Sequence, residues 1–209
     1  MPKTTSKPIA EKYASRKQQI LNAAMQCFSQ HGFLKTTLGD IAKAMNLRKA
    51  SLYYYYESKE AILSDVVAHE GAAYLTRVQA ELLKEKTATR KILRLVKVRL
   101  DHFLKAMSLH KLSVPMFFEV KPVINGFYKN FRQQEAALLR QVIQNAVKSG
   151  EFKACNAEKV AEAVLTITDA VELKGYQVAY ARGDLTVDVH EIETEAAFMA
   201  TLLFNGIKA

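Results

Sequence analysis

Residues 36–60 constrain the fold more than any other stretch of the chain: they read TTLGDIAKAMNLRKASLYYYYESKE, two short helical patterns joined by a tight turn. Thr37 has a hydroxyl that can cap the first helix, and Asp40 stands three residues later as its capping-box partner. Asn46 accepts the left-handed backbone that such a turn requires. We therefore expect a helix-turn-helix here, and a remainder of the chain that positions or switches it.

The second helix of this unit, expected over residues 48–55, has one apolar side and one polar side. Leu52 and Tyr56 are four residues apart and are expected to pack inward. The residues on the outward face and its flanks are Ala50, Ser51, Tyr53 and Tyr54. An outward face of this kind beside a basic start, Arg48 and Lys49, has the geometry of a recognition helix in the major groove of DNA.

The net charge of +9 is concentrated around this motif. Residues 1–60 contain ten Lys and Arg against four Asp and Glu, a net +6, whereas residues 61–209 contribute only +3. A basic segment that coincides with a helix-turn-helix is the expected footprint of a polyanion partner. A solvated basic face is the plainer alternative, so the charge alone does not decide between the two.

Three pieces of sequence, AAMQCFSQHGF, TTLGDIAKAMNL and SLYYYYESKEAIL, follow one another between Ile20 and Leu63. In this order and spacing they resemble the DNA-binding domain of the TetR family of bacterial repressors, over roughly residues 10–65. The family usually has Gly where Asn46 stands, and often a small capping residue where Arg48 stands. The resemblance implies a DNA-binding domain at the N-terminus and an effector pocket in the rest of the chain.

The DNA contacts expected from the motif and the resemblance are Thr37, Arg48, Lys49, Ala50, Ser51, Tyr53, Tyr55 and Lys59. Arg and Lys side chains suit the O6 and N7 atoms of guanine, whereas Ser and Tyr hydroxyls suit phosphates. Ala50 permits close approach or contact with a thymine methyl group. Lys12 and Arg16 in the N-terminal segment are further candidates for phosphate contacts.

The rest of the chain has the periodicity of long helices and no strand run longer than a few residues. Helices are expected over about 11–31, 58–83, 90–108, 157–182 and 187–206. The segment 109–131 is the exception, because Pro115, Pro122 and Asn125-Gly126 predict an irregular stretch before a helix that ends at Ser149.

The sequence therefore predicts an all-α protein in three parts. The parts are a flexible basic arm (1–10), a helix-turn-helix DNA-binding domain (11–57) and a larger helical bundle for effector binding and dimerisation (58–209). The last two helices, rich in small and branched apolar residues, are expected to form a homodimer interface.

An aromatic and methionine-rich set of residues in the C-terminal part is expected to line a ligand cavity: Phe103, Met107, Met116, Phe117, Phe127, Phe131 and Tyr176. The polar residues that could orient a ligand there are His102, His110, Glu119 and Glu172. For any single one of these residues, packing in an ordinary helical core is the more common role.

Other functional classes lack their signatures. The five histidines show no paired metal-ligand spacing, and the chain has no glycine-rich phosphate loop or nucleophile motif, so we expect no metal, no cofactor and no enzymatic activity. Cys27 and Cys155 lack a CxxC spacing, which favours reduced thiols in the cytoplasm. No run approaches the roughly 18 apolar residues that span a membrane, and the N-terminus lacks the apolar core of a signal peptide.

The function that these features favour is a homodimeric repressor that binds a palindromic double-stranded DNA operator and is released by a small, largely apolar ligand. The alternative is a small-molecule sensor or carrier with a vestigial helix-turn-helix. An α-helical enzyme is a third possibility, for which no catalytic constellation is visible.

Overall fold

The computed structural model describes residues 7–109 and 113–209, which form eight α-helices. In chain order these are α1 (Lys7–His31), α2 (Leu38–Ala44), α3 (Lys49–Tyr53), α4 (Lys59–Leu83), α5 (Ala88–Leu109), α6 (Val114–Lys148), α7 (Ala157–Arg182) and α8 (Val189–Ile207). Within these ranges the only β-type pairing is an isolated bridge between Phe152 and Lys208. The all-α class predicted from the sequence is confirmed.

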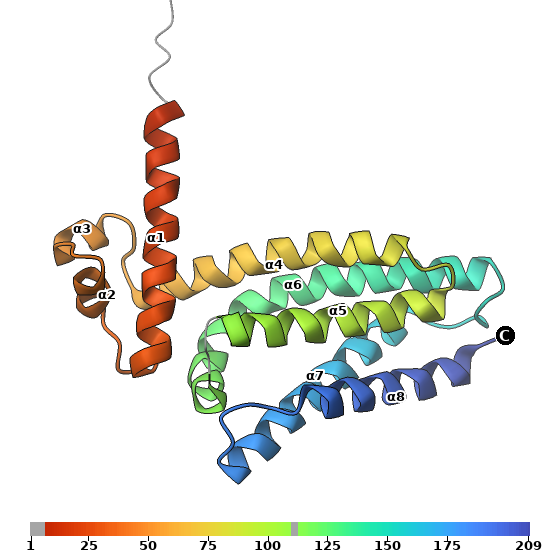
Figure 1. Ribbon diagram of the computed structural model, residues 1–209. Helices are drawn as coiled ribbons and strands as arrows, with labels where there is room; N and C mark the ends of the chain where they lie inside the picture. Colours follow the sequence, from red (N-terminus) through yellow and green to blue (C-terminus); the bar gives the residue numbers. More distant parts are fainter. Residues whose placement is uncertain (1–6, 110–112) are drawn as a thin grey trace, which may run out of the picture.

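The helices form two groups joined by α4 (Figure 1). Helices α1 to α3 make a small unit at one end, and α4 runs from that unit into a bundle with α5 to α8. In the bundle α4 packs on α5 and α6, α7 packs on α6 and α8, and α8 closes the ring against α5. None of the helices in the described part of the chain is long and apolar enough to cross a bilayer.

The helix-turn-helix forms as its local signals predict. Thr37 caps α2 through its side chain, and Asp40 completes the capping box. Asn46 adopts the left-handed backbone in the turn, with φ +54°, and Gly32 does the same after α1, with φ +82°. α3 is shorter than expected, because the helix ends at Tyr53 and Tyr54 forms its C-cap.

The core of this unit extends beyond its own three helices. Ile20, Phe28, Ile41 and Leu52 are completely buried and come from α1, α2 and α3. The same hydrophobic cluster includes residues of α4 and α6: Ile62, Leu63, Val66, Met116 and Val120. Packing is therefore continuous across the domain boundary that we predict between residues 57 and 58.

The prediction of an irregular segment over 109–131 is wrong for its described part, since α6 runs unbroken through Pro122 and Gly126. Pro115 lies in the first helical turn after the N-cap Ser113, where a missing N–H is tolerated. Pro122 removes one backbone hydrogen bond, to the carbonyl of Phe118. Packing on both sides of the proline overrides this loss, because α6 contributes to the core of the helix-turn-helix and to the core of the bundle.

The N-terminal arm is partly helical. Residues 7–10, which we expected to be flexible, form the start of α1, and Pro8 falls in the first turn, where proline is well tolerated. Residues 1–6 of the predicted arm lie outside the described residues.

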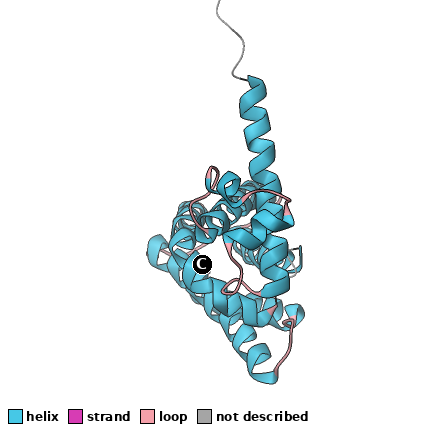
Figure 2. Ribbon diagram, turned by 90° about the vertical axis from the view of Figure 1, so that its left-hand side faces the viewer, coloured by secondary structure: helices cyan, strands magenta, loops and turns pink. Residues whose placement is uncertain are grey.

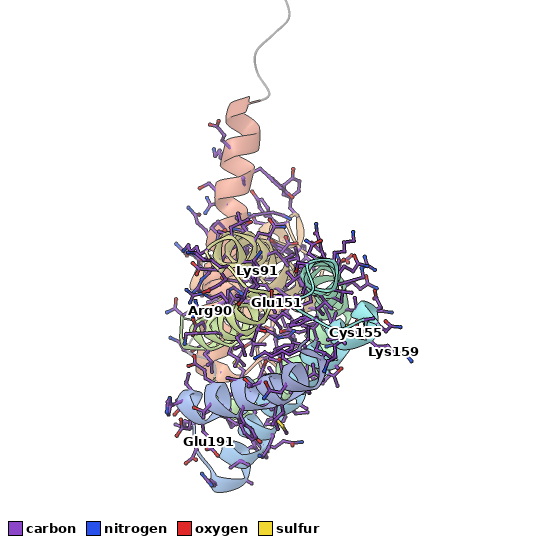
Figure 3. The ribbon with its side chains drawn as sticks, turned by 90° about the vertical axis from the view of Figure 1, so that its right-hand side faces the viewer. Arg90, Lys91, Glu151, Cys155, Lys159 and Glu191 are labelled. Atoms are coloured by element: carbon purple, nitrogen blue, oxygen red, sulfur yellow. The ribbon has the colours of Figure 1, made fainter. Side chains whose placement is uncertain are left out.

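A distant carboxylate caps the start of α5. The side chain of Glu151 accepts hydrogen bonds from the backbone amides of Ala88 (2.9 Å) and Thr89 (3.2 Å). Figure 3 shows Glu151 at the end of the bundle, near Arg90 and Lys91 of α5. The capping carboxylate satisfies two amides that a helix start leaves unpaired, and it ties the α6–α7 connection to α5.

Candidate functional site

The exposed face of α3 brings the predicted recognition residues together. Arg48, Lys49, Ala50 and Ser51 are all exposed at the start of the helix. Tyr53 is 49% exposed, and the Nζ atom of Lys49 lies 5.6 Å from the centre of its ring. The opposite side of α3 is fixed by Leu52, which is completely buried. One side of the helix is therefore held in the core by Leu52, and the other side presents basic and hydroxyl groups to solvent.

Arg48 occupies the N-cap position of α3 and makes no capping hydrogen bond through its side chain. The backbone there is extended (φ −70°, ψ 141°), and no capping hydrogen bond holds the side chain on the start of the helix. An exposed guanidinium at this place, which pairs with no residue in the described part of the chain, is suited to bidentate contact with a guanine edge or a phosphate.

Thr37 and Asp40 are hydrogen-bonded to each other at the start of α2. The Thr37 hydroxyl donates to Asp40 Oδ2 (2.7 Å), and the same carboxylate oxygen accepts from the Thr37 backbone amide (2.9 Å). These hydrogen bonds from Thr37 lower the pKa of Asp40. The Thr37 hydroxyl is thus occupied by the cap, and a phosphate contact at this position would compete with it or be shared with it.

Lys59 is directed into the protein rather than toward the surface of α3. Its Nζ donates to the backbone carbonyls of Phe33 (2.6 Å), Leu34 (3.0 Å) and Thr36 (3.0 Å). An ammonium group has three N–H donors, so all of them are used. These contacts give Lys59 a structural role in the α1–α2 connection, in place of the phosphate contact expected from the sequence.

The four consecutive tyrosines have separate environments. Tyr56 is buried and its hydroxyl donates to Asp65 Oδ2 (2.8 Å). Tyr55 is half-buried and stacks on Tyr13 of α1, with ring centres 5.0 Å apart. Tyr54 is 73% exposed and meets Tyr55 edge to face. The contact with Tyr13 has no signal in the sequence, because it joins residues more than 40 positions apart.

The predicted ligand-binding residues separate into several groups. Phe117 of α6 stacks on Tyr176 of α7, with ring centres 4.2 Å apart, and both are buried. Phe131 of α6 is half-buried, and its ring packs so closely on Gly71 of α4 that a Cβ added to this glycine would lie 2.2 Å from it. The side chains of Phe103, Met107 and Phe127, and all of His110, lie outside the described part of the chain.

Two candidates for the ligand site belong elsewhere. Met116 is 4% exposed and packs in the core of the helix-turn-helix, because it lies on the opposite face of α6 from the bundle. Glu119 accepts a hydrogen bond from the backbone amide of Leu34 (3.3 Å) in the α1–α2 connection. Met116, expected in the wall of a ligand cavity, thus lies in the core of the helix-turn-helix, and Glu119, expected to orient a ligand, binds the α1–α2 connection.

A buried ion-pair network links α5, α6 and α7. Arg99 and Glu135 are each 2% exposed and pair at 2.9 Å. Arg99 also pairs with Asp169, which in turn pairs with Arg132. The only sequence signal was a charged residue at position 99, three and four residues after the apolar Val96 and Leu95. That signal marks the inward face of α5, and sequence reasoning missed it.

The remaining polar candidates lie beside this network. The rings of His102 and Tyr74 are 4.9 Å apart at their centres. Glu172 is 8% exposed, and no described residue donates a hydrogen bond to it. Burial raises the pKa of Glu172 to about 7, although the nearby Arg99 opposes the shift.

The outer side of the last two helices carries uncovered apolar side chains. On α8 these are Phe198 (61% exposed), Met199 (39%) and Leu202 (52%). On α7 Tyr180 is 56% exposed. Tyr180 also contacts Phe118 of α6 edge to face, with ring centres 5.1 Å apart, so the more exposed apolar group of the two helices is the one on α8.

Sequence comparisons match the N-terminal part of the chain. The family model for "Bacterial regulatory proteins, tetR family" matches residues 20–66. The biofilm operon icaADBC HTH-type negative transcriptional regulator IcaR of Staphylococcus aureus (strain Newman) is 47% identical over 51 residues, which are 24% of this chain and 27% of IcaR. IcaR of Staphylococcus epidermidis is 50% identical over 46 residues, 22% of this chain and 25% of IcaR. The chain spans about a quarter of the length of these relatives.

Solved structures match almost the whole chain. A transcriptional regulator from Cytophaga hutchinsonii ATCC 33406 superimposes with a TM-score of 0.71 at 26% identity, covering 92% of this chain and 98% of that protein. A TetR transcription regulator from Haloarcula marismortui ATCC 43049 has a TM-score of 0.65 at 20% identity, covering 94% of this chain and 100% of that protein. The part of the bundle beyond residue 66, where the family match ends, therefore also has the fold of these regulators.

Proposed function

Because the chain belongs to the TetR family of bacterial regulators, we propose that it is a homodimeric transcriptional repressor that a small, largely apolar ligand releases from a palindromic operator. The observation that carries the proposal is the exposed basic face of α3 on a capped, well-packed helix-turn-helix. Such a face is suited to base edges in the major groove, and the net +6 charge of residues 1–60 is suited to the phosphates around it.

The contacts that we propose on DNA follow from exposure. Arg48 and Lys49 read base edges, Ala50 allows close approach, and the hydroxyls of Ser51 and Tyr53 bind phosphates or mixed groups. Thr37 and Tyr55 contribute at the edges of this surface. Lys59 is excluded from the direct contacts, because its ammonium group is satisfied by three carbonyls.

The exposed apolar side chains of α7 and α8 support dimerisation through the two C-terminal helices. Phe198 and Leu202 are one turn apart on α8, so a second copy related by two-fold symmetry would cover both. A dimer would present two recognition helices to one duplex, which fits an operator with two half-sites.

Helix α6 supports a route for release. Met116 and Val120 on one side of α6 pack in the core of the helix-turn-helix, and Glu119 holds the α1–α2 connection. Phe117 on another side stacks on Tyr176 of α7. A ligand that favours a different Phe117–Tyr176 arrangement would shift α6, and with it the spacing of the two recognition helices, by its differential affinity for the two states.

A mobility-shift assay with duplex DNA from the region upstream of the gene tests the proposal. We expect a specific shift at moderate salt that survives an excess of unrelated duplex. The absence of specific binding would overturn the proposal and favour a sensor or carrier with a vestigial helix-turn-helix. Lys86→Ala is a suitable control variant, since Lys86 is exposed in the α4–α5 connection, far along α4 from the helix-turn-helix (Figure 1).

A further inference from the structure

The first turns of α1 project beyond the rest of the molecule (Figures 1 and 2). Lys12 and Arg16 lie there, four residues apart and therefore on one face of the helix. Neither forms an ion pair with any described residue, and Arg16 donates to the neighbouring side chain of Gln19 (2.9 Å). A projecting helix end with two basic side chains of this kind contributes little to the core, so its role lies outside it.

Three aromatic rings, Tyr13, Tyr54 and Tyr55, hold this part of α1 against the end of α3; we call them the tyrosine clamp. Tyr13 stacks on Tyr55 at 5.0 Å between ring centres and meets Tyr54 edge to face at 6.2 Å. Tyr54 meets Tyr55 edge to face at 5.1 Å. Each ring thus contacts the other two, and the clamp joins α1 to the helix that presents the recognition surface.

An ion pair one turn further along α1 strengthens the same junction. The Nζ atom of Lys17 binds Asp65 Oδ2 of α4 at 2.9 Å, and the hydroxyl of Tyr56 donates to the same oxygen. Lys17 Nζ also lies 4.8 Å from the centre of the Tyr56 ring. The direction of α1 is therefore fixed relative to both α3 and α4.

We propose that the first half of α1 is a second DNA-contacting element, in which Lys12 and Arg16 bind backbone phosphates beyond the base pairs read by α3. This inference rests on the proposed function. The tyrosine clamp positions the element, and Tyr13 is its positioning residue. A helix end without tertiary contacts frays. Without the clamp, this part of α1 would have to become ordered when DNA binds, and the entropy cost would reduce the affinity that the two phosphate contacts contribute.

The salt dependence of DNA binding tests this assignment, because each phosphate contact adds about 0.9 to the slope of log K against log salt. The full chain is titrated with a duplex from the region upstream of the gene at several salt concentrations. We expect the double change Lys12→Ala/Arg16→Ala to lower the slope by about 2 per bound protomer. The matched control Lys86→Ala/Lys153→Ala removes the same charge from exposed positions elsewhere and should leave the slope unchanged.

The clamp is tested by Tyr13→Ala and, at a more exposed position, by Tyr54→Ala. We expect Tyr13→Ala to lower the slope nearly as much as the basic double change, with little further loss when the two are combined. Tyr54→Ala should lower the slope by a smaller amount. Tyr13→Phe should bind DNA as the unchanged protein does, since the ring makes the contacts.

Two results would overturn the inference while leaving the proposed function intact. One is an unchanged slope in Lys12→Ala/Arg16→Ala. The other is a loss of DNA affinity in Tyr13→Ala with an unchanged slope, or a loss that simply adds to that of Lys12→Ala/Arg16→Ala when the changes are combined. If the unchanged protein bound no duplex specifically, the proposed function would fail, and this inference with it.

Discussion

The Nζ atom of Lys59, at the start of α4, lies 2.6 Å from the backbone carbonyl oxygen of Phe33, the second residue after α1. The same ammonium group lies 4.6 Å from the centre of the Phe33 ring, so one charge binds both the backbone and the aromatic face of this residue. The connection between α1 and α2 is thereby fixed to the helix that leads into the bundle. Lys59, which we expected from the sequence to contact DNA, thus stabilises the helix-turn-helix unit through these contacts.

Lys59→Ala should therefore lower stability as well as DNA affinity. Hydrogen bonds from a charged donor contribute roughly 1.5–3 kcal/mol, and the change leaves carbonyl groups of this connection without a donor. Urea denaturation should show a decrease of about that size, whereas Lys86→Ala should change stability by less than about 0.5 kcal/mol. A fall in the salt slope of DNA binding by about 1, without loss of stability, would instead show that Lys59 contacts a phosphate.

Local signals were sufficient where neighbouring residues determine the structure. Thr37 and Asn46 were predicted as a cap and a left-handed turn residue, and both have these roles in the structure. Each depends on a side-chain oxygen or on backbone conformation within a few residues. These signals also placed the exposed face of α3, which is most of the candidate DNA site.

The predictions from sequence fail where contacts between residues far apart in the chain determine the structure. Pro122 and Gly126 have strong local signals against a helix, yet α6 continues because its two ends are held by separate cores. Glu119 and Met116 were assigned to a ligand pocket, because periodicity shows that α6 has apolar faces but does not show which partner each face meets. The Tyr13–Tyr55 stack and the Lys59 contacts likewise join segments that no local pattern relates.

Lys49→Ala should change the sequence preference of DNA binding rather than weaken all sequences alike. Lys49 is exposed at the start of α3, where a lysine suits the O6 and N7 atoms of guanine. Loss of such a contact costs about 1–3 kcal/mol at the base pair concerned and relaxes discrimination there. Selection from a randomised duplex library before and after the change measures the effect. An equal loss at every sequence would identify Lys49 as a phosphate contact.

Arg99→Met should destabilise the bundle strongly. The change leaves Glu135 without its cationic partner in the interior, and breaking a buried ion pair costs about 3–5 kcal/mol. Lys97→Met is a matched control on the same helix: Lys97 is half exposed and pairs with Glu193, a kind of contact worth about 0–1 kcal/mol. Chemical denaturation compares the two. Equal stability of the two variants would show that Glu135 becomes neutral at little cost.

Because of Glu172, the free energy of unfolding should fall as the pH rises from about 4.5, its pKa in the unfolded chain, to about 7, its pKa in the folded chain. Burial raises its pKa from 4.5 to about 7 in the folded chain, so the folded state holds a proton that the unfolded state has released. The charged groups that act on it are Arg99 of α5, Lys121 and Glu135 of α6, and Asp169 of α7.

The change Glu172→Gln keeps the size of the side chain and removes the titration. Below about pH 4.5 the carboxyl is neutral in both states, and the variant and the unchanged protein should have similar stability. Above about pH 7 the variant should be more stable by up to about 3 kcal/mol, since each pKa unit corresponds to about 1.4 kcal/mol. Denaturant unfolding at pH 4.5, 6 and 8 measures the difference. A difference that does not grow with pH would show that a cation satisfies Glu172 in the folded protein.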